Sequence, residues 1–251
     1  MSRDAAWDLA RDAADRAGVA LRPLVRLEDA DAILEVMIDT WGEHQLVPRE
    51  ILRALPESGN VPIGAFADGR IVAYVLGWAG VDPVDGLHVH SHMLAVRSGL
   101  RHGGVGYALK LAQRAQALEL GIHVARWTFD PMVARNAYFN ISKLGGVCDR
   151  FERNFYGAME DLLNRGERSD RFVVRWDLDR EPGARDLAPL ALVDVPRDLE
   201  ALRRERSEES AAWRDRVADA VEKQLAEGRV AAVFDRDASA YGFVEAGEVR
   251  A

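Results

Sequence analysis

The feature that most constrains the fold is a glycine loop that follows a strand pattern and leads into a helix. The segment His92–Tyr107 reads HMLAVRSGLRHGGVGY: an apolar strand end, a short break, and then Arg101-x-x-Gly104-x-Gly106. Glycines let successive backbone N–H groups point into one concavity, and the start of the next helix adds partial positive charge there. The segment therefore predicts an anion site that suits a pyrophosphate. It is not a P-loop, because no Gly-Lys-Ser/Thr ends it, and it lies in mid-chain rather than at the start of a dinucleotide-binding unit.

Strand and helix patterns alternate on both sides of this loop. Apolar residues recur three or four positions apart in 27–40 and 104–120, as in amphipathic helices. Asp68-Gly69 predicts a hairpin between strands at 63–67 and 70–80. The remaining patterns predict helices at 4–17, from Pro48 and at 132–144, and strands at 19–25, 88–96, 123–129, 147–155 and 171–178. This order predicts an α/β fold with a mixed central sheet flanked by helices.

The domain organisation is expected to be a helix at 1–18, a sheet domain at 19–180 and an appendage at 196–251. Residues 180–195 are rich in Pro, Gly and Asp, which indicates a linker. The appendage combines a charged amphipathic helix or helical pair with a terminal hairpin. It has too little apolar core to stand alone, so we expect it to pack on the main sheet.

Composition excludes several classes of protein. The 251 residues carry 33 basic and 41 acidic side chains, a net charge of −8, which disfavours a general nucleic-acid binder. The longest apolar run, Ile71–Val81, has 11 residues, whereas a membrane span needs about 20. The single cysteine, Cys148, excludes an internal disulfide and a C-x-x-C metal site. An N-terminus rich in aspartate is unlike a secretory signal, so we expect a cytoplasmic protein with neither nucleic-acid nor membrane partners.

At the glycine loop the chain resembles the GNAT superfamily of acyl-CoA-dependent N-acyltransferases. The apolar strand end Leu94-Ala95-Val96 and the loop Arg101–Gly106 match that family's Leu-x-Val and Q/R-x-x-G-x-G/A pattern without a gap. The order of elements over 19–178 matches as well. Five further segments resemble a subgroup of that superfamily with a C-terminal extension: Trp127–Pro131, Asn136–Asn140, Lys143–Gly145, Tyr156-Gly157 and Ser169–Trp176.

The resemblance implies that coenzyme A lies across the ends of strands 88–96 and 123–129. The backbone of Leu94, Ala95 and Val96 would pair with the pantetheine amides like an added strand. The resemblance also implies which residues hold the pyrophosphate: Arg101 by its charge, and the loop amides of His102, Gly103, Gly104, Val105, Gly106 and Tyr107. Asn136 would hydrogen-bond the pantetheine or acyl end, or is an ordinary polar residue on a helix.

Three histidines, His88-Val-His90-Ser-His92, come directly before the Leu94–Val96 strand end. Period-two spacing in a strand places the three imidazoles on one face of the sheet. Acyl transfer needs a neutral amine, and an imidazole is a suitable base. We expect His92 to be that base, because it stands two residues before Leu94 and so shares its face, with His90 on the approach. A shared zinc ion is one alternative, but no Asp, Glu or Cys falls at a clear spacing to complete the site, and no metal ligand is assigned. A purely structural or surface role of the histidines is the other alternative.

The acid that protonates the leaving thiolate is not identified by the resemblance. Many relatives carry a tyrosine four residues before the glycine that ends the helix after the fifth strand, and that position is Ile141 here. Tyr138 lies three residues earlier and is the first candidate. Tyr107 and solvent are the alternatives.

The resemblance implies direct transfer of an acyl group from acetyl-CoA to the amine of a small molecule, such as an amino acid. Succinyl-CoA is an alternative donor. A catalytically idle CoA-binding or regulatory module, and a metal-binding hydrolase built on the histidines, are alternatives from other classes. The sequence leaves the acceptor, the role of the appendage and a homodimeric state open.

Overall fold

The computed structural model describes residues 3–43, 46–100, 103–159, 161, 167–205 and 207–249, and the chain divides into two compact units. Unit 1 consists of Met1–Ala125, Glu160–Arg165 and Leu178–Arg180. Unit 2 consists of Arg126–Met159, Gly166–Asp177 and Glu181–Ala251. The boundary therefore falls inside strand β5 (Val124–Phe129).

Unit 1 is built on an antiparallel sheet in the order β1-β2-β3-β4. Its strands are β1 (Ala20–Pro23), β2 (Ile63–Ala67), β3 (Arg70–Asp82) and β4 (Gly86–Val96). Its helices are α1 (Arg3–Arg16), α2 (Leu27–Trp41), α3 (Arg49–Glu57), the 3-10 turn η2 (Ser98–Leu100) and α4 (Val105–Glu119). Asp68 and Gly69, with φ of 49° and 74°, form the β2–β3 turn, which needs two positive φ angles. Apart from η2, which was not predicted, these elements lie where the sequence predicts them.

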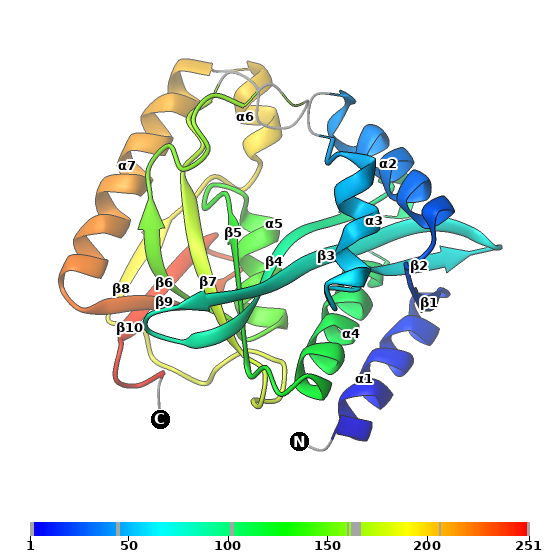
Figure 1. Ribbon diagram of the computed structural model, residues 1–251. Coiled ribbons are helices and arrows are strands. Elements are labelled where there is room, and N and C mark those ends of the chain that lie inside the picture. Colours follow the sequence, from blue (N-terminus) through cyan, green and yellow to red (C-terminus); the bar gives the residue numbers. More distant parts are fainter. Residues whose placement is uncertain are drawn as a thin grey trace. The chain divides into compact units, whose positions relative to one another are not determined.

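Helices cover both faces of the unit 1 sheet. Helices α1 and α4 run side by side (Figure 1) and form one core with strand residues such as Val75 and Leu94. Helices α2 and α3 form the other core, with Leu76 among its strand residues. Val75 and Leu76 belong to opposite cores because successive side chains of a strand point to opposite faces. A side chain of β3 or β4 can therefore be assigned to the α1–α4 face or to the α2–α3 face of the sheet by the core in which it packs.

Unit 2 contains the end of β5 and five further strands in the order β5-β7-β6-β9-β10-β8. These are β6 (Val147–Glu152), β7 (Arg171–Asp177), β8 (Ala191–Asp194), β9 (Arg229–Asp235) and β10 (Ala240–Glu245). Its helices are α5 (Ala134–Ala137), η3 (Tyr138–Lys143), α6 (Leu199–Glu205) and α7 (Ser207–Ala226). Strand β9 pairs with β6, so the terminal hairpin continues the sheet of this unit.

Two expectations for this half of the chain are wrong in detail. The single α-helix expected at 132–144 is a short α-helix, α5, followed by the π-helix η3. The stretch expected to be a linker contains β8, which pairs with β10 through residues such as Val193 and Tyr241. Both features depend on packing partners distant in the sequence, which a local pattern does not show.

The core of unit 2 is aromatic. The rings of Trp127 and Trp176 meet edge to face at 6.0 Å, and those of Phe172 and Tyr241 lie 5.1 Å apart. The buried Tyr241 hydroxyl donates to the carbonyl of Pro131 at 2.8 Å, which satisfies its polar end. Such a core fixes the C-terminal hairpin to the turn that follows β5.

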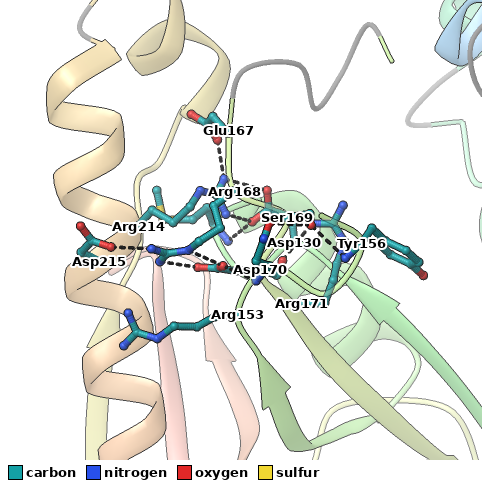
Figure 2. Close-up of polar contacts among 12 residues, drawn as sticks. Asp130, Arg153, Tyr156, Glu167, Arg168, Ser169, Asp170, Arg171, Arg214 and Asp215 are labelled. Atoms are coloured by element: carbon teal, nitrogen blue, oxygen red, sulfur yellow. Dashed lines mark hydrogen bonds and ion pairs between the residues drawn. The ribbon is translucent and has the colours of Figure 1, made fainter. Parts of the chain in front are cut away.

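A charged network joins α6 and α7 to the rest of unit 2. The buried Arg214 guanidinium donates to both carboxylate oxygens of Asp130, at 3.2 and 3.0 Å, and also to Glu167. Arg203 donates to the same two carboxylates, and Ser210 donates to Glu167 at 2.6 Å. Figure 2 shows Arg214 on its helix pointing toward Asp130 beside the start of β7. Two guanidinium groups thus face two carboxylates, and the charges balance.

A second set of ion pairs lies further along α7. Arg168 donates to Asp170, at 2.6 and 2.8 Å, and to Asp215 at 2.8 Å (Figure 2). Arg153 donates to Asp219 and Glu222 in the same way.

In the described part of the chain, no helix combines the length and the apolar character that crossing a bilayer requires.

Candidate functional site

The glycine loop has the geometry of an anion site at the start of α4. Gly104 is the N-cap residue and adopts the left-handed conformation at φ 88°, with no side chain capping the helix. The first intrahelical bond runs from Ala108 N–H to the Gly104 carbonyl at 3.0 Å. The N–H groups of the first helical turn, which precede Ala108, therefore donate to no carbonyl of this helix. The first turn contains no acidic residue. Two predicted members of the site, Arg101 and His102, lie outside the described residues.

The first turn of α4 crosses closely over the end of β4. A Cβ atom at Gly106 would lie 3.3 Å from Leu94 Cδ2 and 3.8 Å from Val96 Cγ2. Glycine at this position therefore allows a close approach of helix and strand. Leu94 and Val96, like Val105 and Tyr107, belong to the core between the sheet and α4, whereas Ala95 belongs to the opposite core. The structure thus brings most of the predicted cofactor residues together.

Strand β4 carries a bulge at His92. Met93 pairs with Leu76 and Ser91 pairs with Gly77, which leaves His92 as the extra residue in the ladder with β3. Gly77 makes this possible, because a Cβ there would lie 2.4 Å from the His90 carbonyl oxygen. A glycine opposite the bulge lets the two backbones approach.

The bulge changes which side chains share a face. Leu94 packs in the core of α1 and α4, whereas Met93 packs in the core of α2 and α3. The His92 ring lies 4.7 Å from that of Trp78, which packs against the α2–α3 core. The expectation that His92 shares a face with Leu94 is therefore wrong, because one extra residue reverses the alternation. Ser91, two places before Met93, is on the α4 side.

The histidines form an aromatic cluster with Trp78. The His90 ring lies 5.1 Å from Trp78 and 5.8 Å from His92, which confirms their shared face. His88 keeps the register of His90, and its ring lies over Gly80, 2.9 Å from where a Cβ would be. Among the described residues, no group of three or more His, Cys, Asp or Glu side chains is arranged to hold a metal.

Burial lowers the pKa of two of these imidazoles, His90 and His92. It lowers the pKa of His90 to about 4, with smaller contributions from the charges of His92, His88 and Lys110. It also lowers the pKa of His92, although that side chain remains partly exposed. Both rings are neutral at physiological pH. They can accept a hydrogen bond from an amine, but His90 holds a transferred proton only weakly.

Two residues of this region were not anticipated from the sequence. Lys110, on α4, is buried and donates from Nζ to the Ser91 hydroxyl at 2.7 Å. Burial lowers the pKa of Lys110 to about 7. The signal that the sequence offered for Lys110 was that one of the three lysines of the chain lies inside the amphipathic 104–120 pattern. Ser91 carried no local signal, because its role depends on the bulge.

The remaining predicted residues belong to unit 2. Asn136 lies in α5 and is half-buried. Tyr138 begins the π-helix, and its ring faces two cations, Arg236 at 5.2 Å and Lys143 at 5.9 Å. Ile141 is 1% exposed and fills the core, so no acid stands at that position. The roles of Asn136 and Tyr138 stay predictions.

The described part of the loop fits the pyrophosphate of coenzyme A. An uncapped helix start, a left-handed glycine and a first turn without a carboxylate together favour an anion. The close crossing at Gly106 places that site next to the backbone of Leu94, where a pantetheine could follow the strand. The chemistry of the residues present is therefore consistent with an acyl-CoA.

Comparison with known proteins gives similarity to solved structures alone. No model of a protein family and no curated protein matches the sequence. Naa20 from Chaetomium thermophilum, solved with a bisubstrate analogue, is 17% identical over 67% of this chain and 93% of its own, with a TM-score of 0.49. A GNAT-family acetyltransferase from Streptococcus pneumoniae is 14% identical over 62% and 98%, with a TM-score of 0.49. The ribosomal-protein-S18-alanine N-acetyltransferase from Escherichia coli is 11% identical over 68% and 99%, with a TM-score of 0.47.

The fold class is as predicted, an α/β fold in which mostly antiparallel strands are flanked by helices.

Proposed function

We propose that this chain is an acyl-CoA-dependent N-acyltransferase, with acetyl-CoA as the default donor and a small-molecule amine, such as an amino acid, as acceptor. The observation that carries the proposal is the close crossing of the glycine loop over the end of β4. The crossing is at Leu94, two residues after the bulge at His92. The proposed anion site and the bulged strand are therefore neighbours, which suits a thioester that carries a pyrophosphate.

The proposal assigns binding to the chain's own backbone and side chains. The amides of Gly103–Tyr107 would hold the pyrophosphate, and the sequence predicts that Arg101 and His102 contribute to its binding. The backbone of Leu94–Val96 would pair with the pantetheine amides. A bound acyl-CoA supplies a thioester carbonyl whose carbon bonds to the acceptor nitrogen as the C–S bond breaks. Because His92 stands outside the ladder with β3, a backbone N–H at the bulge is suited to hold the carbonyl oxygen.

The aromatic cluster is proposed to contact the acceptor. Neutral imidazoles at His90 and His92 can accept a hydrogen bond from an amine, and Trp78 offers an aromatic face to an ammonium group. Asn136 would hydrogen-bond the pantetheine or acyl end. Tyr138, or solvent, would protonate the departing thiolate.

Calorimetric titration with acetyl-CoA, succinyl-CoA and free CoA tests the binding step. Gly106→Val should weaken binding more than tenfold, a loss of at least about 1.4 kcal/mol, because its side chain would enter the space between α4 and Leu94. Gly99→Val is the matched control, because a Cβ at Gly99 meets nothing within 4 Å. Equal affinities in folded Gly106→Val and wild type would overturn the assignment of the loop.

An acceptor screen that measures thiol release tests the transfer step and identifies the donor. Thiol release with at least one amine is the expected result. Tight CoA binding without release for any amine would instead indicate an idle CoA-binding module. Stabilisation by zinc, without any effect of CoA, would favour the metal-dependent alternative.

A further inference from the structure

The aromatic cluster of Trp78, His90 and His92 forms a partly open surface on the α2–α3 face of the sheet. Each ring contacts both of the others, with centroid separations of 4.7 to 5.8 Å and interplanar angles of 31° to 42°. His92 is exposed, whereas Trp78 and His90 are half-buried, and Trp78 packs on the core beneath. A small molecule can therefore reach the three rings from solvent.

The nitrogen atoms of these three rings can bond to a ligand. Over the residues that the structure describes, none of them makes a hydrogen bond, whereas Nδ1 of the neighbouring His88 lies 3.2 Å from the Gly86 carbonyl oxygen. The indole N–H is a donor, and a neutral imidazole has one donor and one acceptor nitrogen. A ligand at the cluster thus meets aromatic rings with donors and acceptors at their edges.

The cluster is next to the predicted position of the thioester. His92 precedes Leu94 by two residues, a distance of at most about 7 Å along the strand. His92 is also the extra residue of the bulge, where a backbone N–H is proposed to hold the thioester carbonyl. An amine bound at the cluster is therefore close to the carbonyl carbon that it attacks.

The charges around the cluster favour an acceptor that arrives neutral. Of the described side chains whose charges act on His90, none is a carboxylate and all are basic: His92, His88 and Lys110. Burial lowers the pKa of His90 to about 4 and also lowers that of His92, so neither ring holds a proton well at physiological pH. An ammonium group has to lose a proton before its nitrogen can attack. A strongly basic amine, such as that of lysine with a pKa of about 10.4, is neutral in only about one molecule in 10³ at pH 7.

We propose that the acceptor is an arylamine, a primary amine attached directly to a flat aromatic ring that stacks on the rings of Trp78, His90 and His92. This inference rests on the proposed function and narrows its acceptor. The lone pair of an arylamine nitrogen is delocalised into the ring, so the amine is neutral at physiological pH and needs no base before it attacks. Its ring gains the aromatic contacts of the cluster, and its N–H groups can donate to an imidazole nitrogen.

The transfer then needs no net base. The neutral nitrogen bonds to the carbonyl carbon, the C–S bond breaks, and its electron pair leaves with sulfur. The nitrogen gives up one proton and the thiolate takes up one. The products are an N-aryl amide and the free thiol, with no proton left over.

Thiol release by the whole chain at pH 7, with acetyl-CoA and four matched amines, tests the ring and the basicity separately. Aniline combines an aromatic ring with a weakly basic amine, benzylamine has only the ring, trifluoroethylamine has only the weakly basic amine, and cyclohexylamine has neither. With the uncatalysed rate subtracted, the kcat/KM of aniline should exceed that of each other amine by about tenfold or more. A kcat/KM for benzylamine, trifluoroethylamine or an amino acid such as phenylalanine that equals the value for aniline would overturn the proposal.

A substitution at Trp78 tests whether the cluster causes this preference. Trp78→Leu keeps an apolar side chain on the core and removes the aromatic ring, so the KM of aniline should rise about tenfold, with acyl-CoA affinity within a few-fold. Trp213→Leu is the matched control and should equal wild type, because Trp213 is also half-buried but lies on α7. An unchanged KM in folded Trp78→Leu would overturn the proposal. The comparison of amines uses wild type alone, so it decides the question even if Trp78→Leu fails to fold.

The two proposals fail in different ways. Thiol release that is as efficient with benzylamine or cyclohexylamine as with aniline would end the arylamine assignment and leave the acyltransferase in place. A wild type that binds no acyl-CoA, or releases no thiol with any amine, would end the proposed function and the arylamine assignment with it.

Discussion

Replacing Arg214 by methionine tests how the C-terminal helices are held in unit 2. The Arg214 side chain is 4% exposed and bonds to Asp130 and Glu167, whose side chains are 8% and 16% exposed. Methionine keeps the aliphatic stem and removes the charge, so two buried carboxylates share Arg203 alone. Breaking a buried ion pair costs about 3–5 kcal/mol. Because Arg203 still contacts both acids, we expect about 3 kcal/mol, or a fall in Tm of roughly 6–12 °C for a chain of this size.

The pH dependence of that loss follows from Glu167. Burial by itself would raise the pKa of Glu167, and hydrogen bonds from Arg203, Ser210 and Arg214 outweigh it and lower the pKa to about 2. A lowered carboxyl pKa contributes stability that is fully present above the ordinary value of 4.5 and is lost as the pH falls through about 2. This contribution is at most about 3 kcal/mol. Without Arg214 the pKa rises, so the stability gap between wild type and variant should narrow as the pH is lowered below 4.5.

Urea unfolding followed by tryptophan fluorescence at pH 7 and pH 4 measures both effects. Arg216→Met is the matched control, because Arg216 lies on the same helix with its guanidinium exposed, 4.5 Å from the Trp213 ring centre. Loss of an exposed cation–π contact costs about 0.5–1 kcal/mol. If Arg214→Met costs no more than Arg216→Met, or if the gap is the same at both pH values, the network does not hold the helices as argued.

Three further predictions concern other parts of the chain. Gly77→Ala should lower the free energy of unfolding by about 1–3 kcal/mol, because its Cβ would lie 2.4 Å from the His90 carbonyl; a stability equal to wild type would contradict the account of the bulge. His92→Ala should raise the acceptor KM about tenfold with kcat within a few-fold, since one hydrogen bond is lost; steady-state kinetics decide, and an unchanged KM would remove the residue from the acceptor site. Truncation at Arg185 should leave β6 without β9 and cause aggregation, measured by light scattering; a soluble, folded product would show the segment to be dispensable.

Local patterns predicted most elements of the fold because the physics behind them is local. Asp68-Gly69 predicts the β2–β3 turn, since its conformation needs two residues that tolerate positive φ. The glycine loop is predicted for the same reason, as Gly104 needs a left-handed backbone and Gly106 a missing side chain. The apolar spacing of the 27–40 and 104–120 segments likewise locates α2 and α4.

The candidate site was predicted in part. The residues that were predicted to bind the cofactor, around Leu94 and Gly106, lie close together as expected, because they are close in the chain and a tight loop joins them. The face expected for His92 was wrong. Period-two reasoning put His92 beside Leu94, and the bulge opposite Gly77 reverses that relation.

The sequence by itself determined most of the elements, the glycine loop and the resemblance to a family, because each depends on residues that are close together in the chain. The tertiary structure alone decided which side chains meet. The bulge depends on Gly77 facing Ser91 across two strands, and the Arg214–Asp130 contact joins residues 84 positions apart. The pairing of Lys110 with Ser91 likewise needs α4 to fold back along β4. Spacing along the chain predicts local conformation. Burial arises only when distant segments pack together and exclude water, and the lowering of the Lys110 pKa depends on that burial.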